Sequence, residues 1–200
     1  PNTAKKIGME VREIPLDAGK VHDLSAMAKA IDNNTAHVYI CNPANPTSTM
    51  LKPAALKAFC EEASKKAVVS IDEAYIDFLD APDNESMIGL IRNGNKNIVV
   101  VRTFSKIHAM AGLRVGYIVA HPETIEKLQA NYFGNSNFCV GSLPIHAAMA
   151  SMKDTGHRES CKQKNAAARE YTHQALVNLG FKPIRSYTNF MYFPLKNYAG

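Results

Sequence analysis

The sequence predicts an α/β fold with a largely parallel sheet, and three observations lead to that prediction. Apolar runs of four to six residues alternate with longer stretches of helical period, as they do in β-α-β units. Pro53 and Pro122 stand where helices would begin, a position that does not need a backbone N–H. With 200 residues, 46% hydrophobic and 20% charged, the chain is large enough to bury a core.

The predicted elements follow one another along the chain. Short apolar runs rich in Val and Ile predict strands at residues 10–14, 37–41, 68–71, 98–102 and 115–120. Stretches of helical period predict helices at residues 24–31, 53–66 and 122–132. Met27, Met149 and Met152 lie at helical spacing, so we expect them to fill the core.

The pattern changes in the last quarter of the chain. Residues 154–179 predict one long helix with a polar face, and Gly180 suits the position just after its end. Residues 181–194 predict strands of a second, smaller α+β unit. We therefore expect a large domain over residues 1–152 and, over residues 153–200, a linking helix and the start of a small domain. Because the chain begins at Pro1 and stops directly after a strand-like run, we expect it to be part of a longer protein.

Composition excludes some classes of protein and favours others. The longest apolar runs are far shorter than the about 20 residues that a membrane helix needs, so we expect no membrane span. Cys41, Cys60, Cys139 and Cys161 are too widely spaced for a zinc site or a disulfide framework. We therefore predict no bound metal, free thiols and, from those thiols, a cytoplasmic location.

Charge is unevenly distributed along the chain. The net charge is +5, and residues 101–200 hold 12 basic side chains against 5 acidic ones. This excess is compatible with a phosphorylated ligand. No Arg/Lys run or helix-turn-helix signal accompanies it, so we expect no nucleic-acid partner.

Polar side chains gather where three predicted strands end, which is where open α/β sheets bind ligands. The first strand runs into a loop with two prolines that presents Asn45, and the second delivers Asp72 and Tyr75. The third delivers Thr103, Ser105 and Lys106, with Arg114 following. Each residue alone has an ordinary structural explanation as a turn, a cap or a solvated surface group. Together they offer an amine, an anion for a ring cation, partners for a phenolic oxygen and groups for a phosphate, which fit pyridoxal 5′-phosphate.

Three segments carry a resemblance to a known family. Residues 42–47 (NPANPT), 72–75 (DEAY) and 103–117, which open with TFSK and close with GLRVGY, resemble the ordered motifs of class I/II aminotransferases of fold type I. The branch that they resemble most is the histidinol-phosphate aminotransferases. The resemblance implies a three-layer α/β/α large domain with a mostly parallel sheet, a small C-terminal domain, pyridoxal 5′-phosphate as cofactor and a homodimer.

The resemblance also implies a role for each residue. Lys106 would bond the cofactor's aldehyde and then move the substrate's Cα proton, and Asp72 would pair with the pyridine nitrogen. Asn45 and Tyr75 would hydrogen-bond the ring's 3′-oxygen, and Asn189 would lie near the substrate carboxylate. The phosphate would be held by Thr103, Ser105 and Arg114. The resembled loop usually has a glycine where this chain has Ser48, which lacks glycine's freedom at positive φ.

The implied activity is transfer of an amino group between an amino donor and a 2-oxo acid such as 2-oxoglutarate, with a histidinol-phosphate-like substrate favoured. Two alternatives share the motifs: a lyase or decarboxylase such as threonine-phosphate decarboxylase, and a non-catalytic regulator with an aminotransferase-like domain. Residues on the substrate side would separate the first, and a DNA-binding module ahead of this domain would mark the second. The ring-stacking aromatic and the phosphate-binding amides are expected upstream of Pro1, and the carboxylate-binding arginine downstream of Gly200. We interpret His108, two residues past Lys106, as a core or solvated histidine rather than a proton shuttle.

Overall fold

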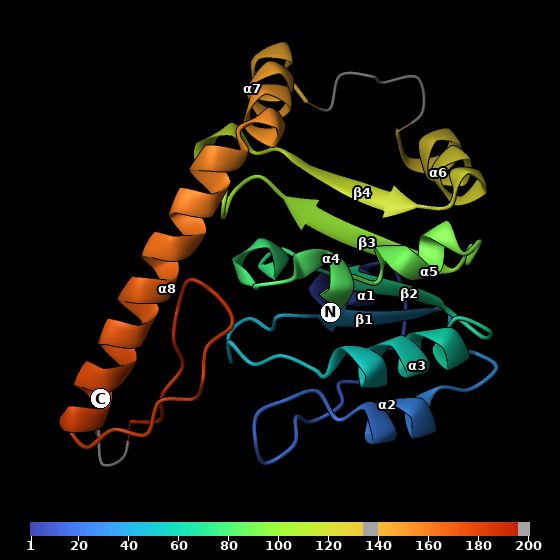
Figure 1. Cartoon of the computed structure of the whole chain (residues 1–200). Helices are drawn as coiled ribbons and strands as arrows, with labels where there is room; N and C mark the ends of the chain where they lie inside the picture. Colours follow the sequence, from blue (N-terminus) through green and yellow to red (C-terminus); the bar gives the residue numbers. More distant parts are fainter. Residues whose placement is uncertain (134–139, 196–200) are drawn as a thin grey trace.

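The fold is built around a four-stranded sheet, as Figure 1 shows for the computed structural model of the chain. The structure describes residues 1–133 and 140–195. The strands lie in the order β1 (His37–Cys41), β2 (Val68–Asp72), β3 (Ile98–Thr103) and β4 (Gly116–Ala120). The first three run parallel and β4 runs antiparallel to β3. The predicted α/β class with a mostly parallel sheet is therefore confirmed.

Four of the five predicted strands match to within one residue at each end. The prediction of a strand at residues 10–14 is wrong, because that segment is irregular. A strand needs a neighbour for its backbone groups, and within the described part of the chain no strand pairs with this segment. Arg12 holds it instead, through bonds from Nη1 to the Ala30 carbonyl oxygen at 3.0 Å and to Asp32 Oδ2 at 2.7 Å.

The helices next to the sheet begin where the sequence predicts. They are α2 (Leu24–Ala30), α3 (Pro53–Ala63) and α6 (Pro122–Leu128), and both prolines occupy the first helical position. Asp23 caps α2 by accepting a bond from the Ala26 N–H at 2.9 Å. Helix α3 ends three residues earlier than predicted, and α6 passes into a π-helical turn at Gln129–Phe133. The shorter elements α1 (Asn2–Lys6), α4 (Pro82–Glu85) and α5 (Ile88–Arg92) are not predicted, because four or five residues show no periodicity.

One face of the sheet forms the main core. Alternate strand residues point to this face and pack against α3 and α5, which lie in front of the sheet in Figure 1. The buried strand side chains are Val38, Ile40, Val69, Ile71, Ile98 and Val100. The opposite face carries Tyr39 and Ile118, which are 54% and 39% exposed, together with Asp72. The sheet thus separates a buried core from a more open face. Asp72 lies on the open face, at the carboxyl end of its strand.

Two helices follow the sheet, α7 (Ser142–Lys153) and α8 (Thr155–Asn178). The long helix predicted for residues 154–179 is confirmed, and so is its end: Gly180 has φ +83° and its N–H bonds to the Val177 carbonyl oxygen at 2.9 Å. Met27 packs against the core as predicted. The prediction for Met149 and Met152 is wrong, because both lie on α7 and are 54% and 55% exposed.

The segment after α8 departs from its predicted structure. Over the described residues 181–195 no strand forms, so the prediction of strands at 181–194 is wrong there. One backbone bond, from the Ile184 N–H to the Tyr192 carbonyl oxygen at 2.9 Å, joins the two halves of the segment. Pro183 has no N–H to donate, and the carbonyl oxygen of Phe190 is taken by the hydroxyls of Ser186 and Thr188, so no ladder extends from that bond. The domain boundary near residue 152 stays a prediction.

The sequence predicts no membrane-spanning helix, and the helices of the structure can be compared with that prediction. No helix within residues 1–133 and 140–195 is long and apolar enough to cross a bilayer. Cys41, Cys60 and Cys161 are free thiols, and Cys139 lies outside the described residues.

Candidate active site

The candidate site lies at the carboxyl ends of β1, β2 and β3. Parallel register brings these ends together, because Cys41 is aligned with Asp72 and Asp72 with Val101. Backbone bonds continue past the strands: the Asn42 N–H donates to the Asp72 carbonyl oxygen and the Glu73 N–H to that of Val101, both at 2.9 Å. The loops that follow the three strands therefore start side by side.

The first loop is held by its own hydrogen bonds. Asn42, 2% exposed, accepts a bond from the Leu51 N–H on its side-chain oxygen at 2.8 Å. The Ser48 N–H donates to the Ala44 carbonyl oxygen at 2.9 Å, and Ser48 itself is fully buried at φ +58°. The position where the resembled motif has glycine thus has a left-handed backbone here, and a serine occupies it. The loop leaves Asn45 exposed at its tip.

Asn45, Tyr75 and Lys106 come together from three different loops. Asn45 Nδ2 donates to Tyr75 Oη at 3.0 Å, and Lys106 Nζ lies 5.2 Å from the centre of the Tyr75 ring. The ring is buried and packs edge-on against Phe190, with 5.2 Å between centroids. A buried phenol with its oxygen bonded to an amide and its face toward an ammonium is a fixed feature rather than a mobile surface group.

Asp72 ends β2 with both carboxylate oxygens engaged. Oδ2 accepts a bond from Tyr39 Oη at 2.7 Å, and Oδ1 accepts one from the Ala74 N–H at 3.1 Å. Sequence reasoning missed Tyr39, although the period of two along β1 places it on the open face with Cys41. An ionised carboxylate has about four acceptor positions, so these two donors leave room for a ligand.

The next residue, Glu73, points to the opposite face and is 1% exposed. Its carboxylate accepts bonds from the Met87 N–H at 2.8 Å, from Ser86 Oγ and from Arg102, whose Nη2 lies 2.9 Å away. Burial raises the pKa of Glu73 above its usual range, against the Met87 bond and the Arg102 charge, which lower it. The anchored Glu73 fixes the backbone that presents Asp72.

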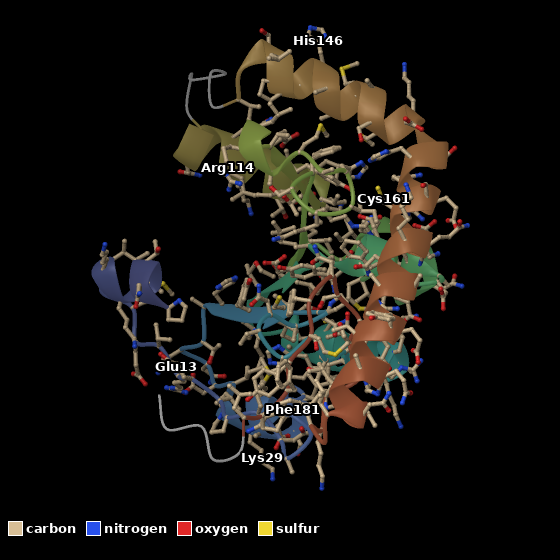
Figure 2. The ribbon with its side chains drawn as sticks, turned by 90° about the vertical axis from the view of Figure 1, so that its left-hand side faces the viewer. Glu13, Lys29, Arg114, His146, Cys161 and Phe181 are labelled. Carbon is tan, nitrogen blue, oxygen red and sulfur yellow. The ribbon has the colours of Figure 1, made fainter. Side chains whose placement is uncertain are left out.

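Two hydroxyls and a guanidinium lie close together at the end of β3 and in the loop that follows it. The Ser105 N–H donates to Thr103 Oγ1 at 3.1 Å, and Arg114 Nη1 lies 3.5 Å from Ser105 Oγ and 2.9 Å from the Ala111 carbonyl oxygen. Arg114 is exposed, and Figure 2 shows it at the opposite end of the molecule from Lys29. The start of β4 requires glycine at position 116, because a Cβ there would lie 2.8 Å from the Arg102 carbonyl oxygen. Hydroxyls beside a planar guanidinium suit a phosphate group.

Asn189 lies in a segment that contacts the first loop. The Tyr187 N–H donates to the Ser48 carbonyl oxygen at 2.9 Å, and Phe190 packs on Tyr75. On the other side, Asn165 of α8 donates to the Thr188 carbonyl oxygen at 3.2 Å. Asn189 is exposed between these anchored neighbours. Phe190 was not predicted from the sequence, since its contact with Tyr75 is purely tertiary.

His108 is a core histidine, in line with its interpretation from the sequence. It is 8% exposed, its Nδ1 lies 2.8 Å from Ser151 Oγ on α7, and its ring packs against Phe104 at 4.7 Å. Burial lowers the pKa of His108 below the ordinary value. The imidazole therefore joins α7 to the loop after Lys106.

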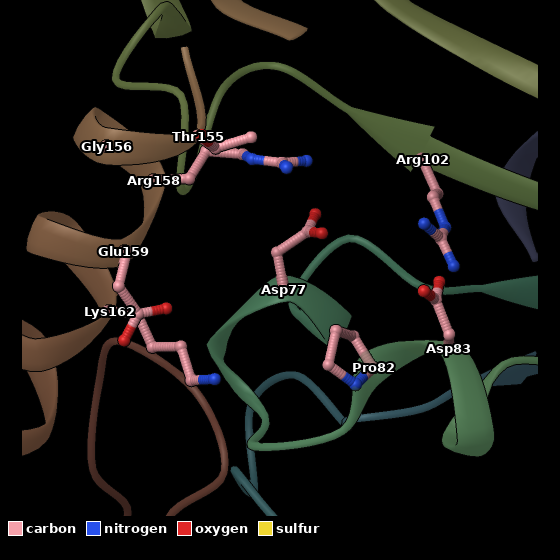
Figure 3. Close-up of a pocket in the computed structure, with 9 residues that line it drawn as sticks. All are labelled: Asp77, Pro82, Asp83, Arg102, Thr155, Gly156, Arg158, Glu159 and Lys162. Atoms are coloured by element: carbon pink, nitrogen blue, oxygen red, sulfur yellow. The ribbon is translucent and has the colours of Figure 1, made fainter. Parts of the chain in front are cut away.

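Figure 3 shows a hollow of about 450 Å³ between η1 (Ile76–Phe78), α4 and the start of α8. Its charged lining residues are Asp77, Asp83, Arg102, Arg158, Glu159 and Lys162. Acids and bases are equal in number, and Arg102 already pairs with Glu73, so no excess charge selects an ion. The eight site residues predicted from the sequence are not among the described residues that line it.

The donor set at the strand ends fits pyridoxal 5′-phosphate. A carboxylate at the end of β2, an amide bonded to a phenol, an amine over that phenol and a hydroxyl–guanidinium cluster match its ring nitrogen, 3′-oxygen, aldehyde and phosphate. These groups come from the ends of the strands and the loops that follow them, at the edge where open α/β sheets bind ligands.

Comparisons with known proteins agree with this arrangement. Residues 1–199 match the family described as aminotransferase class I and II. A histidinol-phosphate aminotransferase from Moorella thermoacetica is 38% identical over 175 residues, which are 88% of this chain and 45% of that protein. An aromatic amino acid aminotransferase from Mycobacterium sp. (strain KMS) is 36% identical over 195 residues, which are 98% of this chain and 53% of that protein.

A solved structure shows the same fold. The crystal structure of the histidinol-phosphate aminotransferase from Clostridium acetobutylicum matches with a TM-score of 0.87 and 26% identity, over 98% of this chain and 58% of that one. The chain spans about half the length of the curated relatives that it matches. The family match, the fold and the ordered strand-end loops together show that this chain belongs to the class I and II aminotransferases.

Proposed function

We propose that the full-length protein is a pyridoxal 5′-phosphate-dependent aminotransferase that moves an amino group between an amino donor and a 2-oxo acid such as 2-oxoglutarate. The observation that carries the proposal is the meeting of Asn45, Tyr75 and Lys106 at the strand ends, beside the loop that Asp72 begins. When bound, the cofactor supplies an electron sink for negative charge at the substrate's Cα.

Each side chain has one task in this proposal. Lys106 is the amine that holds the cofactor's aldehyde carbon and moves the proton at the substrate's Cα. Asp72 keeps the ring nitrogen protonated by offering it a carboxylate. The amide of Asn45 and the phenol of Tyr75, which already contact each other at 3.0 Å, orient the ring through its 3′-oxygen.

The phosphate is assigned to Thr103, Ser105 and Arg114. Arg114 has φ +52°, and its Nη1 already bonds the Ala111 carbonyl oxygen. This fixed guanidinium donates in a planar fork, which matches two phosphate oxygens better than a lysine would. Asn189 is assigned to the substrate carboxylate, since its segment is bonded to the loop that presents Asn45.

The favoured substrate is histidinol phosphate or a close analogue. The name of the 38% identical relative supports it, and so does the basic second half of the chain. The 36% identical relative is named for aromatic amino acids, so phenylalanine is the natural competitor in an assay.

We also propose that the full-length protein is a homodimer. Ile145, Met149 and Met152 recur at helical spacing on α7 and are 44%, 54% and 55% exposed, and Leu143 is 71% exposed. Exposed apolar side chains repeated along one helix are typical of a surface that another chain covers. Sedimentation equilibrium of the full-length protein, with Met149→Lys as the variant, tests the dimer.

The function is tested on the full-length protein with its cofactor. Borohydride reduction followed by peptide mapping should place the pyridoxyl mass on the peptide with Lys106, and glutamate should change the cofactor's visible spectrum. Lys106→Ala should abolish both effects, and Lys57→Ala, at an exposed position on α3, should abolish neither.

The outcomes separate the alternatives. A mass on Lys106 with a spectral response to glutamate supports the aminotransferase. A pyridoxyl mass on Lys106 without any spectral response to amino donors favours the lyase or the regulator. The absence of that mass from every peptide would refute the cofactor assignment. Initial rates with histidinol phosphate and with phenylalanine then rank the two donors.

A further inference from the structure

We propose that Tyr39 is a positioning residue for Asp72: its phenol fixes the orientation in which the Asp72 carboxylate meets the cofactor's ring nitrogen. This inference rests on the proposed function. Neither the motifs in the sequence nor the resemblance assigns a role to Tyr39.

The register of the sheet brings the two side chains together. Tyr39 is aligned with Ser70 and Cys41 with Asp72, so Tyr39 and Asp72 lie on the same face of neighbouring parallel strands, two residues apart along the sheet. Tyr39 Oη spans that offset and donates to Asp72 Oδ2 at 2.7 Å. A hydrogen bond to an ionised acceptor at this distance belongs to the stronger class in proteins.

The rest of the carboxylate is fixed by the backbone. Oδ1 accepts from the Ala74 N–H at 3.1 Å, so each oxygen has one donor and the carboxylate cannot rotate without losing one of them. The neighbouring Glu73 is anchored on the far face by Arg102, so the strand end cannot turn. The position of Asp72 is therefore set by three strands: β1 through the phenol, β2 through its own backbone, and β3 through Arg102.

The phenol of Tyr39 stays protonated and can therefore keep donating to Asp72. Partial burial, followed by the bond to Asp72 and its charge, raises the pKa of Tyr39 well above its ordinary value, so the O–H persists at neutral and alkaline pH. Tyr39 is 54% exposed, so its ring is not a core element that must be conserved for folding. His37, on the same face, lies with its Nε2 2.8 Å from Ser70 Oγ and is not a rival donor to Asp72.

The expected chemical effect follows from donation. The phenol holds Oδ2 in its present position, so the carboxylate can keep one hydrogen bond to the protonated ring nitrogen. Without the phenol, the carboxylate can leave its present orientation and lose its hydrogen bond to the ring nitrogen, which then holds its proton less firmly. Tyr39 would thus act on the ring nitrogen through Asp72, without touching the cofactor.

The test compares three variants of the full-length protein. Tyr39→Phe keeps the ring and removes the O–H. Tyr171→Phe is the matched control, an exposed tyrosine on α8, 79% exposed. Asp72→Asn removes the carboxylate itself. The two readouts are the dissociation constant of pyridoxal 5′-phosphate, titrated into the apoprotein, and the ¹⁵N chemical shift of cofactor labelled at the pyridine nitrogen.

We expect Tyr39→Phe to weaken cofactor binding by about three- to tenfold, the range for one ordinary hydrogen bond, because the lost bond acts on the cofactor only through Asp72. We expect its ¹⁵N shift to move part of the way toward the unprotonated value, and Asp72→Asn to move it further. Tyr171→Phe should change neither readout, and the thermal midpoint should be the same for both phenylalanine variants.

Each contrary result has its own meaning. If Asp72→Asn moves the ¹⁵N shift and Tyr39→Phe leaves it at the wild-type value, the role of Tyr39 is refuted and the cofactor assignment stands. Weaker binding in Tyr39→Phe with an unchanged ¹⁵N shift would make Tyr39 merely structural, and would also overturn the inference. If the wild type binds no cofactor, the proposed function itself fails.

Discussion

The carbonyl oxygen of Ser48 accepts a hydrogen bond from the N–H of Tyr187 at 2.9 Å, so a loop early in the chain is joined to a segment near its end. Ser48 can direct its carbonyl there because its backbone is left-handed, at φ +58°. The same loop presents Asn45, and the same late segment presents Asn189 and Phe190. One backbone bond thus joins the loop proposed to contact the cofactor to the segment proposed to contact the substrate.

A substitution at Ser48 should be judged by backbone conformation more than by side-chain chemistry. Ser48→Val puts a β-branched residue at positive φ and should lower the free energy of unfolding by about 2 kcal/mol. Ser48→Gly loses the bond from Oγ to the Thr47 carbonyl oxygen but gains conformational freedom, so the two effects should nearly cancel. Urea unfolding of the full-length protein measures both. Equal losses in the two variants would contradict this account.

Removing the carboxylate of Glu73 should destabilise the fold strongly. Glu73→Ala leaves Arg102, whose side chain is only 10% exposed, without its ionic partner, and we expect a loss of about 3–5 kcal/mol. Glu73→Gln should lose less, because the amide oxygen can still accept from the Met87 N–H. As a control, Glu62→Ala removes an exposed ion pair to Lys65 and should leave the unfolding midpoint unchanged. A small effect of Glu73→Ala would mean that Arg102 finds water or another partner.

Acidification should destabilise the protein through His108. Burial, the largest cause, and the charges of Arg158 and His157 lower the pKa of His108, while Asp77 opposes them. With a folded pKa below the unfolded value of about 6.5, the unfolded chain binds a proton first, so the stability that neutral His108 provides is lost as pH falls below that value. His22 and His37, whose pKa values burial also lowers, act in the same direction.

The measurement for this prediction is the thermal midpoint between pH 7.5 and pH 5.5. His108→Gln should show a shallower decline than the wild type. A decline of the same steepness would assign the pH dependence to the other histidines.

Replacing Gly180, at the end of α8, should destabilise the protein because of its positive φ. Gly180→Ala forces a Cβ into φ +83° and should cost about 1 kcal/mol. The same substitution at Gly89, in the helix α5 with nothing within 4 Å of a Cβ, should instead stabilise by about 0.5 kcal/mol. Opposite signs for the two variants in chemical unfolding are the expected result, and two losses would contradict the role of backbone conformation.

Local patterns predicted the elements whose partners lie close by. Strands β1 to β4 were predictable because their apolar runs are short and bounded by turns, and α3 and α6 because a proline marks each start. The segment 10–14 has similar residues but, among the described residues, no strand beside it. The prediction of strands at 181–194 is wrong for a related reason. Pro183 lacks an N–H, and hydroxyl groups bond the Phe190 carbonyl oxygen, so no ladder of strand hydrogen bonds forms. Strand formation depends on neighbours that a short window of sequence does not contain.

The residues of the candidate site also fall into those that local motifs predict and those that depend on distant contacts. Asn45, Tyr75 and Lys106 were predictable from ordered motifs, and the structure brings them together. Tyr39 and Phe190 were not, because each acts through a contact with a residue far away in the chain. Met149 and Met152 show the opposite error: helical spacing says that one face is apolar, but not which surface covers it.

A single peptide bond at the end of β2 separates two carboxylates with opposite surroundings, Asp72 on the open face and Glu73 in the buried ion pair. Inserting or deleting one residue within Val68–Asp72 would move each carboxylate to the opposite face, because every side chain after the change would switch faces. The ligand side would then receive the longer acid, and Arg102 would lose the carboxylate that pairs with it. Strand β2 should therefore tolerate a substitution at Ser70, on its open face, better than any change in its length.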